Sequence, residues 1–296
     1  MSWRVTIPCS REQGERIADA EDLFPRSDIQ PVVVADEPDE ARPNEWLLHA
    51  YFEQEPTEEE LMRLRELGKG DPQIEHLEDT VDWVTKSQSG LQPIRAGRFF
   101  VHTPMHYGDR PSDTVNFEVD AGLAFGTGQH ATTAGCLEAL DKLKRKDCCF
   151  TNVVDVGTGT GLLAFATLAL WPQAKCIASD IDPVAIDVAR ENAAINAVRL
   201  GHASGELLLA VADGMDSPML AARAPFDLII ANILAGPLIE LAPDFAKALA
   251  PGGTIILAGL LDTQADAVIQ AYALQGLKLS DRNFGEWPVL VCERQA

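Results

Sequence analysis

Several features that would mark a secreted, membrane-spanning or metal-binding protein are missing from this chain of 296 residues. Its six cysteines form no C-x-x-C pair, and neither they nor its six histidines show the spacing of metal ligands. No apolar run reaches about 18 residues, and the first residues lack the apolar core of a signal peptide. Scattered, unpaired cysteines are typical of a reducing compartment. We therefore expect a soluble, cytoplasmic protein with no metal site and no membrane partner.

Positive charge is also scarce. The chain has 24 Lys and Arg against 45 Asp and Glu, a formal net charge of −21, and an isoelectric point near 4.5. A surface this acidic repels phosphates, which argues against direct DNA binding and against general nucleic-acid binding. It favours either simple solubility or attraction to a basic partner. Hydrophobic residues make up 46% of the chain, which is enough for a substantial core.

The sequence predicts two domains joined by a linker. Residues 1–85 show the pattern β-α-β-β-α-β of a small α+β, ferredoxin-like domain. Gly, Ser, Pro and Gln cluster in residues 86–97, which we interpret as the linker. The small domain is strongly acidic and carries no chemical motif. It is interpreted either as a substrate-recognition module or as an appendage that only packs.

Residues 98–296 are predicted to form the second domain. From about Asn116 onward, strands alternate with helices, which indicates an α/β, Rossmann-like fold with a mainly parallel sheet between helices. The last two strands, residues 277–282 and 288–293, are expected to close the chain as a hairpin. Ligands bind at the carboxyl ends of such sheets. Four residues fall at predicted strand ends: Gly157, Asp180, Asp213 and Asn232.

The most informative segment is VVDVGTGTG, residues 153–161, a buried strand that runs into a glycine-rich turn. The turn lets a ligand approach the backbone at Gly157 and Gly159, and Asp180 at the next strand end can accept both ribose hydroxyls. A dinucleotide fingerprint would need a glycine where Leu162 stands, and a phosphate-binding P-loop would need a lysine that is absent. A ligand with ribose but no phosphate fits best, which favours S-adenosylmethionine.

A second signal is AFGTGQHATT, residues 124–133, which places glycines, hydroxyls and a histidine just before a helix. A helix start has free N–H groups, so Thr133 can cap the helix or contact a ligand. His130 is interpreted as a hydrogen-bonding spacer, with a role as a base as the alternative.

A third signal is Asn232, which follows the apolar strand DLIIA. Its neutral amide can donate to or accept from a reacting amine at the strand end. The alternative is that Asn232 is only a turn residue.

Together these motifs resemble the ribosomal protein L11 methyltransferase family (PrmA type). The resemblance rests on AFGTG-x-H-x-TT, the glycine turn, DIDP at 180–183 and ANILAGPL at 231–238, and it runs from about Arg98 to the end. Over the first hundred residues it is architectural only. It implies cofactor contacts by Thr133, Gly157, Asp180 and Asn232, to which the turn adds Gly159. Gln129 and Ala131 stand where the family usually has Thr and Pro.

The resemblance implies a protein methyltransferase that transfers methyl groups from S-adenosylmethionine to lysine or N-terminal amines of large-subunit ribosomal protein L11. Two alternatives stay open: a lysine methyltransferase acting on another protein, such as an electron-transfer flavoprotein subunit, and a non-catalytic binding module with the cofactor fold. A release-factor glutamine methyltransferase is disfavoured, because that group carries Asn-Pro-Pro-Tyr in place of the residues from Asn232 to Ala235. We expect no dedicated catalytic base, with Asn232 as the candidate for positioning the amine.

Overall fold

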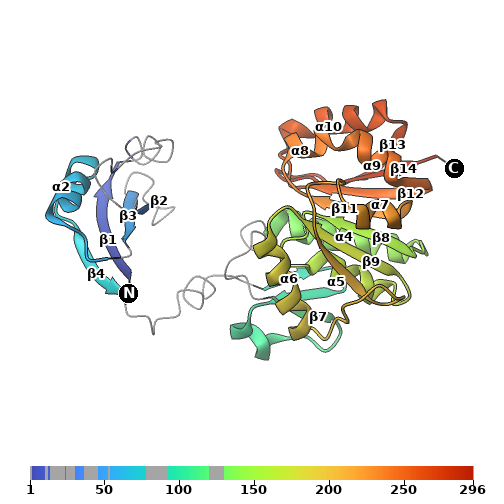
Figure 1. Ribbon diagram of the computed structural model, residues 1–296, viewed down its shortest axis with the longest axis horizontal. Coiled ribbons are helices and arrows are strands. Elements are labelled where there is room, and N and C mark those ends of the chain that lie inside the picture. The colour runs from blue at the N-terminus through green and yellow to red at the C-terminus, as the bar shows by residue number, and fades with distance from the viewer. Residues whose placement is uncertain are drawn as a thin grey trace. The chain divides into compact units, whose positions relative to one another are not determined.

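The computed structural model describes residues 2–10, 13, 24, 31–36, 46–52, 54–77, 93–119 and 130–295. The chain divides into two compact units, Met1–Lys86 and Ser87–Ala296, and each is described by itself (Figure 1). The first helix of the predicted β-α-β-β-α-β pattern, over residues 12–24, lies outside the described residues apart from Gln13 and Phe24, and so does the segment 124–129.

The smaller unit is built on a four-stranded sheet with the order β2-β3-β1-β4, in which all neighbours are antiparallel. This order is that of a ferredoxin-like sheet and agrees with the predicted fold class. Its described elements are β1 (Ser2–Cys9), β2 (Val32–Asp36), β3 (Trp46–Phe52), α2 (Glu58–Leu67) and β4 (Gln73–Leu77). Helix α2 begins with a capping box, because Thr57 Oγ1 accepts from Glu60 N while the Glu60 carboxylate accepts from Thr57 N. Its residues Leu61 and Leu64 complete the buried core of the sheet.

The larger unit opens with a small three-stranded sheet of order β5-β6-β7. Its elements are β5 (Ile94–Ala96), β6 (Phe99–His102), the 3-10 helix η1 (Pro104–Asp109) and β7 (Val115–Glu118). Strand β5 falls inside the stretch that the sequence assigns to the linker. It pairs with β6, so these residues are part of the folded unit rather than a free connection.

The main sheet has seven strands in the order β10-β9-β8-β11-β12-β14-β13. Its strands are β8 (Asn152–Val156), β9 (Lys175–Asp180), β10 (Leu207–Val211), β11 (Phe226–Asn232), β12 (Leu249–Ala258), β13 (Leu277–Arg282) and β14 (Leu290–Arg294). The first five run parallel, and β14 lies antiparallel between β12 and β13. The mainly parallel sheet and the terminal hairpin agree with the sequence prediction.

Helices cover both faces of this sheet (Figure 1). They are α4 (His130–Arg145), α5 (Leu162–Leu170), α6 (Pro183–Ile195), α7 (Pro218–Arg223), α8 (Ala235–Glu240), α9 (Ala242–Ala248) and α10 (Asp262–Leu274). The strands alternate between two cores: Ile230 faces the core with α4 and α5, whereas Ile229 faces the core with α8, α9 and α10. Within the described ranges, no helix has both the length and the apolar character needed to cross a membrane.

Candidate functional site

The glycine turn after β8 has a backbone that side chains would disrupt. Gly157, Gly159 and Gly161 all have positive φ, at 71°, 53° and 85°. This left-handed region strongly favours glycine. A Cβ on Gly157 would also lie 2.2 Å from Ile233 Cγ2. The turn is therefore held against Ile233, in the segment that follows β11.

Asp180 ends β9 and holds the turn from the neighbouring strand. Its Oδ2 accepts from Gly159 N at 2.9 Å, and its Oδ1 accepts from Asp182 N at 3.1 Å. A carboxylate offers about four acceptor positions, so two are left after these bonds. Two positions are what the neighbouring hydroxyls of a ribose require. The pairing of Gly159 with Asp180 was not foreseen, since the sequence treats them as separate ligand contacts.

Asn232 ends β11, one strand away from the glycine turn. Its Oδ1 is buried and has no hydrogen-bond partner among the residues that the structure describes. An unpaired buried acceptor costs stability, and such atoms in folded proteins call for an explanation in terms of function. The next residue is fixed by the neighbouring strand end, because a Cβ on Gly259 would lie 2.4 Å from the Ile233 carbonyl oxygen. The backbone that carries Asn232 is thus packed against the end of β12.

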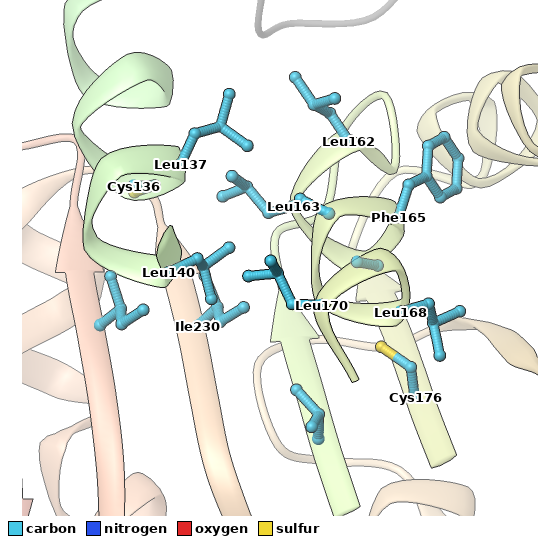
Figure 2. Packing of buried hydrophobic residues seen from close by; sticks show 14 of the residues in the cluster. Cys136, Leu137, Leu140, Leu162, Leu163, Phe165, Leu168, Leu170, Cys176 and Ile230 are labelled. Carbon is cyan, nitrogen blue, oxygen red and sulfur yellow. The ribbon is translucent and has the colours of Figure 1, made fainter. Parts of the chain in front are cut away.

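Thr133 lies in the first turn of α4 and is 5% exposed. The helix is fixed by its buried face: Figure 2 shows Leu137 and Leu140 beside Leu163 of α5 and above Ile230 of β11. Packing on β11 places α4 over the strand that ends at Asn232. The side chain of His130 lies outside the described residues, so its predicted role stays a prediction.

The strand order brings these positions to one edge. Strand β8 lies between β9 and β11, and the carboxyl ends of parallel strands share an edge. Gly157, Asp180 and Asn232 therefore follow three adjacent strands. Asp213, the fourth predicted strand-end residue, follows β10 beyond Asp180 and is exposed.

Asp155 is a buried acid near the site that the sequence analysis did not single out. It is 1% exposed, and its Oδ2 accepts from Thr158 Oγ1 at 2.7 Å. Burial raises the pKa of Asp155 to about 7, while hydrogen bonds from the Thr158 hydroxyl and the Ala164 backbone N–H lower the pKa and the charge of Asp180 raises it. The signal that could have pointed to Asp155 in the sequence is its position two residues before Gly157. A cation bound nearby would favour its charged form.

The residues fit S-adenosylmethionine, which carries a ribose without phosphates and a cationic methionine end. The ribose can use the remaining acceptor positions of Asp180, and the glycines of the turn carry no side chain of their own that would keep a ligand from the backbone. The unpaired Asn232 oxygen and the buried Asp155 provide acceptors for N–H groups or positive charge. Among the residues that the structure describes, no group of three His, Cys, Asp or Glu could hold a metal ion.

Comparison with known proteins agrees with this geometry. Residues 2–295 match the family model for ribosomal protein L11 methyltransferase (PrmA), which extends the predicted resemblance into the small unit. A protein of that name from Brucella suis is 51% identical over 213 residues, 71% of each chain. Another, from Mesorhizobium japonicum, is 40% identical over 276 residues, 93% of each chain. A crystal structure of ribosomal protein L11 methylase from Lactobacillus delbrueckii subsp. bulgaricus is 29% identical, with a TM-score of 0.57 over 69% of this chain and 100% of that one. The chain belongs to the ribosomal protein L11 methyltransferase (PrmA) family.

Proposed function

We propose that this protein transfers methyl groups from S-adenosylmethionine to amino groups of large-subunit ribosomal protein L11, on lysine side chains, the N-terminal amine or both. The observation that carries the chemistry is the buried Asn232 Oδ1 near the glycine turn, which has no hydrogen-bond partner in the described part of the chain. The family and its relatives support the substrate, because their names specify this ribosomal protein. Since the substrate is a ribosomal protein, we also propose that the enzyme acts in the cytoplasm.

The cofactor contacts that we propose come from four strand ends or helix starts. Asp180 accepts the ribose hydroxyls, while Gly157 and Gly159 bring backbone close to the ligand. Thr133 closes the site from the start of α4, and Asn232 lies on the side where the substrate amine enters. When bound, S-adenosylmethionine supplies a methyl group activated by its sulfonium. The chain then has to hold amine, methyl and sulfur in line, so positioning accounts for much of the rate.

The target amine must be neutral before it can attack. A free lysine has a pKa near 10.4 and is mostly protonated at neutral pH. Burial and a nearby positive charge lower that pKa, whereas a carboxylate raises it. Asn232 provides an acceptor without a charge, so it can orient the amine without raising its pKa. We propose no dedicated general base, because these effects act on the amine itself.

The small unit is proposed to recognise the substrate, joined to the methyltransferase domain by the residues that precede β5. Residues 1–86 carry 22 Asp and Glu against nine Lys and Arg. This charge favours attraction of a basic ribosomal protein from a distance. At the amine itself the same carboxylates would raise the pKa, so their place on a separate unit suits the reaction.

A methyl-transfer assay tests the proposed function. The purified protein is incubated with radiolabelled S-adenosylmethionine and, separately, with purified ribosomal protein L11 and an electron-transfer flavoprotein subunit. We expect label in L11 and none above background in the flavoprotein subunit. Label in the flavoprotein subunit alone would mean that this subunit, and not L11, is the substrate. No transfer to any protein of a whole lysate, together with intact cofactor binding, would make the chain a binding module.

A further inference from the structure

The loop between β13 and β14, residues 283–289, lies on the same edge of the sheet as Asn232. One row of paired residues crosses four neighbouring strands: Ala231, Leu257, Leu290 and Arg282. Asn232 and the loop both come one residue after this row. Neighbouring strands lie about 4.8 Å apart, and β13 is three strands away from β11. The β13 end of the loop, at Asn283, therefore lies about 14 Å from Asn232. An extended peptide spans that distance with about four residues.

The loop is anchored at its base. Val289 N donates to Asn283 Oδ1 at 2.5 Å, and Asp262 N at the start of α10 donates to Glu286 O at 2.9 Å. A Cβ on Gly135 would lie 2.6 Å from Val289 Cγ2, so α4 packs directly on the base of the loop. The same helix carries Thr133 two residues earlier. The loop is therefore fixed to the two elements that border the candidate site.

This anchored loop presents an aromatic ring to solvent. Phe284 is 90% exposed, more than any other large apolar side chain in the described part of the chain. Gly285 follows with φ +145°, and a Cβ there would meet nothing within 4 Å, so the backbone conformation rather than packing favours glycine. Among the described residues of the larger unit, the ring therefore makes little packing contact. A single exposed apolar residue is ordinary by itself, so a role for Phe284 has to be argued from the residues near it.

Three carboxylates lie on the loop or on the part of α10 to which the loop is bonded, those of Asp262, Asp266 and Glu286. Arg282 bridges Asp262 at 2.6 Å and Asp266 at 3.7 Å, and the Asp266 side chain remains 96% exposed. One guanidinium thus faces two carboxylates, and Glu286 adds a third, exposed one on the loop itself. An aromatic face bordered by excess negative charge suits a lysine or arginine, whose aliphatic stem lies on the ring while its cation faces the acids.

We propose that Phe284, Glu286, Asp262 and Asp266 form a docking surface for the basic peptide segment that flanks the target amine of the substrate protein. This surface, called the Phe284 surface below, rests on the proposed function and adds a contact on the methyltransferase domain itself. It holds a lysine or arginine about four residues from the amine at Asn232.

The test is steady-state methylation of purified ribosomal protein L11 by the full-length protein and its Phe284→Ala variant. We expect the KM for L11 to rise about tenfold, as for a central aromatic at an interface, with kcat and the Kd for S-adenosylhomocysteine unchanged. Phe284→Trp should stay within twofold of the unaltered protein. Glu286→Gln should raise KM about twofold at low salt and not at high salt.

Leu274→Ala is the matched control. Leu274 is also apolar and is 77% exposed, but it ends α10 close to where β13 begins, away from the carboxyl edge. The KM of the Leu274→Ala variant for L11 should not change. If Phe284→Ala keeps the KM of the unaltered protein, or if Leu274→Ala raises KM equally, the Phe284 surface is wrong while the proposed function stands. If the unaltered protein binds cofactor but does not methylate L11, the proposed function fails and this surface fails with it.

Discussion

Charge and chemistry are distributed differently over the two units. Residues 1–86 have a net charge of −13, from 22 acidic and nine basic residues, whereas residues 87–296 have −8, from 23 acidic and 15 basic residues. Per residue, the small unit is about four times as acidic. Every candidate cofactor or amine contact lies in the larger unit.

This difference follows from what each unit is proposed to do. Attraction of a basic protein needs many charges and little geometry. Methyl transfer needs fixed geometry and an amine whose pKa is not raised by nearby carboxylates. The larger unit supplies that geometry through a sheet with a core on each face and a turn held by Asp180 and Ile233. Variants that affect one property and spare the other sharpen this comparison.

Among variants of the larger unit, Asp180→Ala should have the largest effect on cofactor binding. It removes the proposed ribose acceptor and the bond to Gly159 N. Two hydrogen bonds to a charged group are worth about 3 kcal/mol in total, so the Kd for S-adenosylhomocysteine should rise about 100-fold in calorimetry. Asp187→Ala on α6 removes an exposed carboxylate paired with Arg190 and should leave the Kd unchanged. An unchanged Kd in Asp180→Ala would show that Asp180 does not bind the ribose.

Asp155→Asn tests the buried acid through stability. Burial holds the Asp155 pKa at about 7, above its ordinary value of 3.8, so the folded state binds the proton more tightly than the unfolded state does. The stability that this proton contributes is present at low pH and is lost as the pH rises through 7. Acidification from pH 7.5 to 5.5 should therefore add about 2 kcal/mol to the unfolding free energy of the unaltered protein relative to the variant. Urea titrations at both pH values measure this difference, and parallel curves would contradict the buried-acid account.

Asn232→Asp tests whether a neutral group at the amine matters. A carboxylate there should raise the pKa of the target amine by about one unit and move the pH dependence of kcat to higher pH. At pH 7.5 the rate should fall about tenfold and recover in part near pH 9. Asn232→Ala should instead lower kcat at every pH. A pH profile that does not move in Asn232→Asp would show that Asn232 does not touch the amine.

Local patterns predicted much of the fold and part of the site. The glycine turn and Asp180 could be predicted because a tight turn and the end of a strand depend on residues that are adjacent in the sequence. The contacts of Ile233 with Gly157 and Gly259 could not, because they depend on β8, β11 and β12 lying side by side. Burial of Asp155 depends on the same long-range packing. The strand β5 was missed because its three residues stand among Gly, Pro and Gln, which suggest a loop.

The most direct test of the division between the units uses a variant that lacks residues 1–86. Cofactor binding and methylation of L11 are measured side by side for this variant and the full chain. We predict a Kd for S-adenosylhomocysteine within about twofold of the full chain, because the cofactor contacts all lie in the larger unit. Loss of a tethered docking unit typically lowers apparent affinity by about 10² to 10⁴, so kcat/KM for L11 should fall by that factor. A truncated protein that binds cofactor and methylates L11 with unchanged kcat/KM would contradict the account.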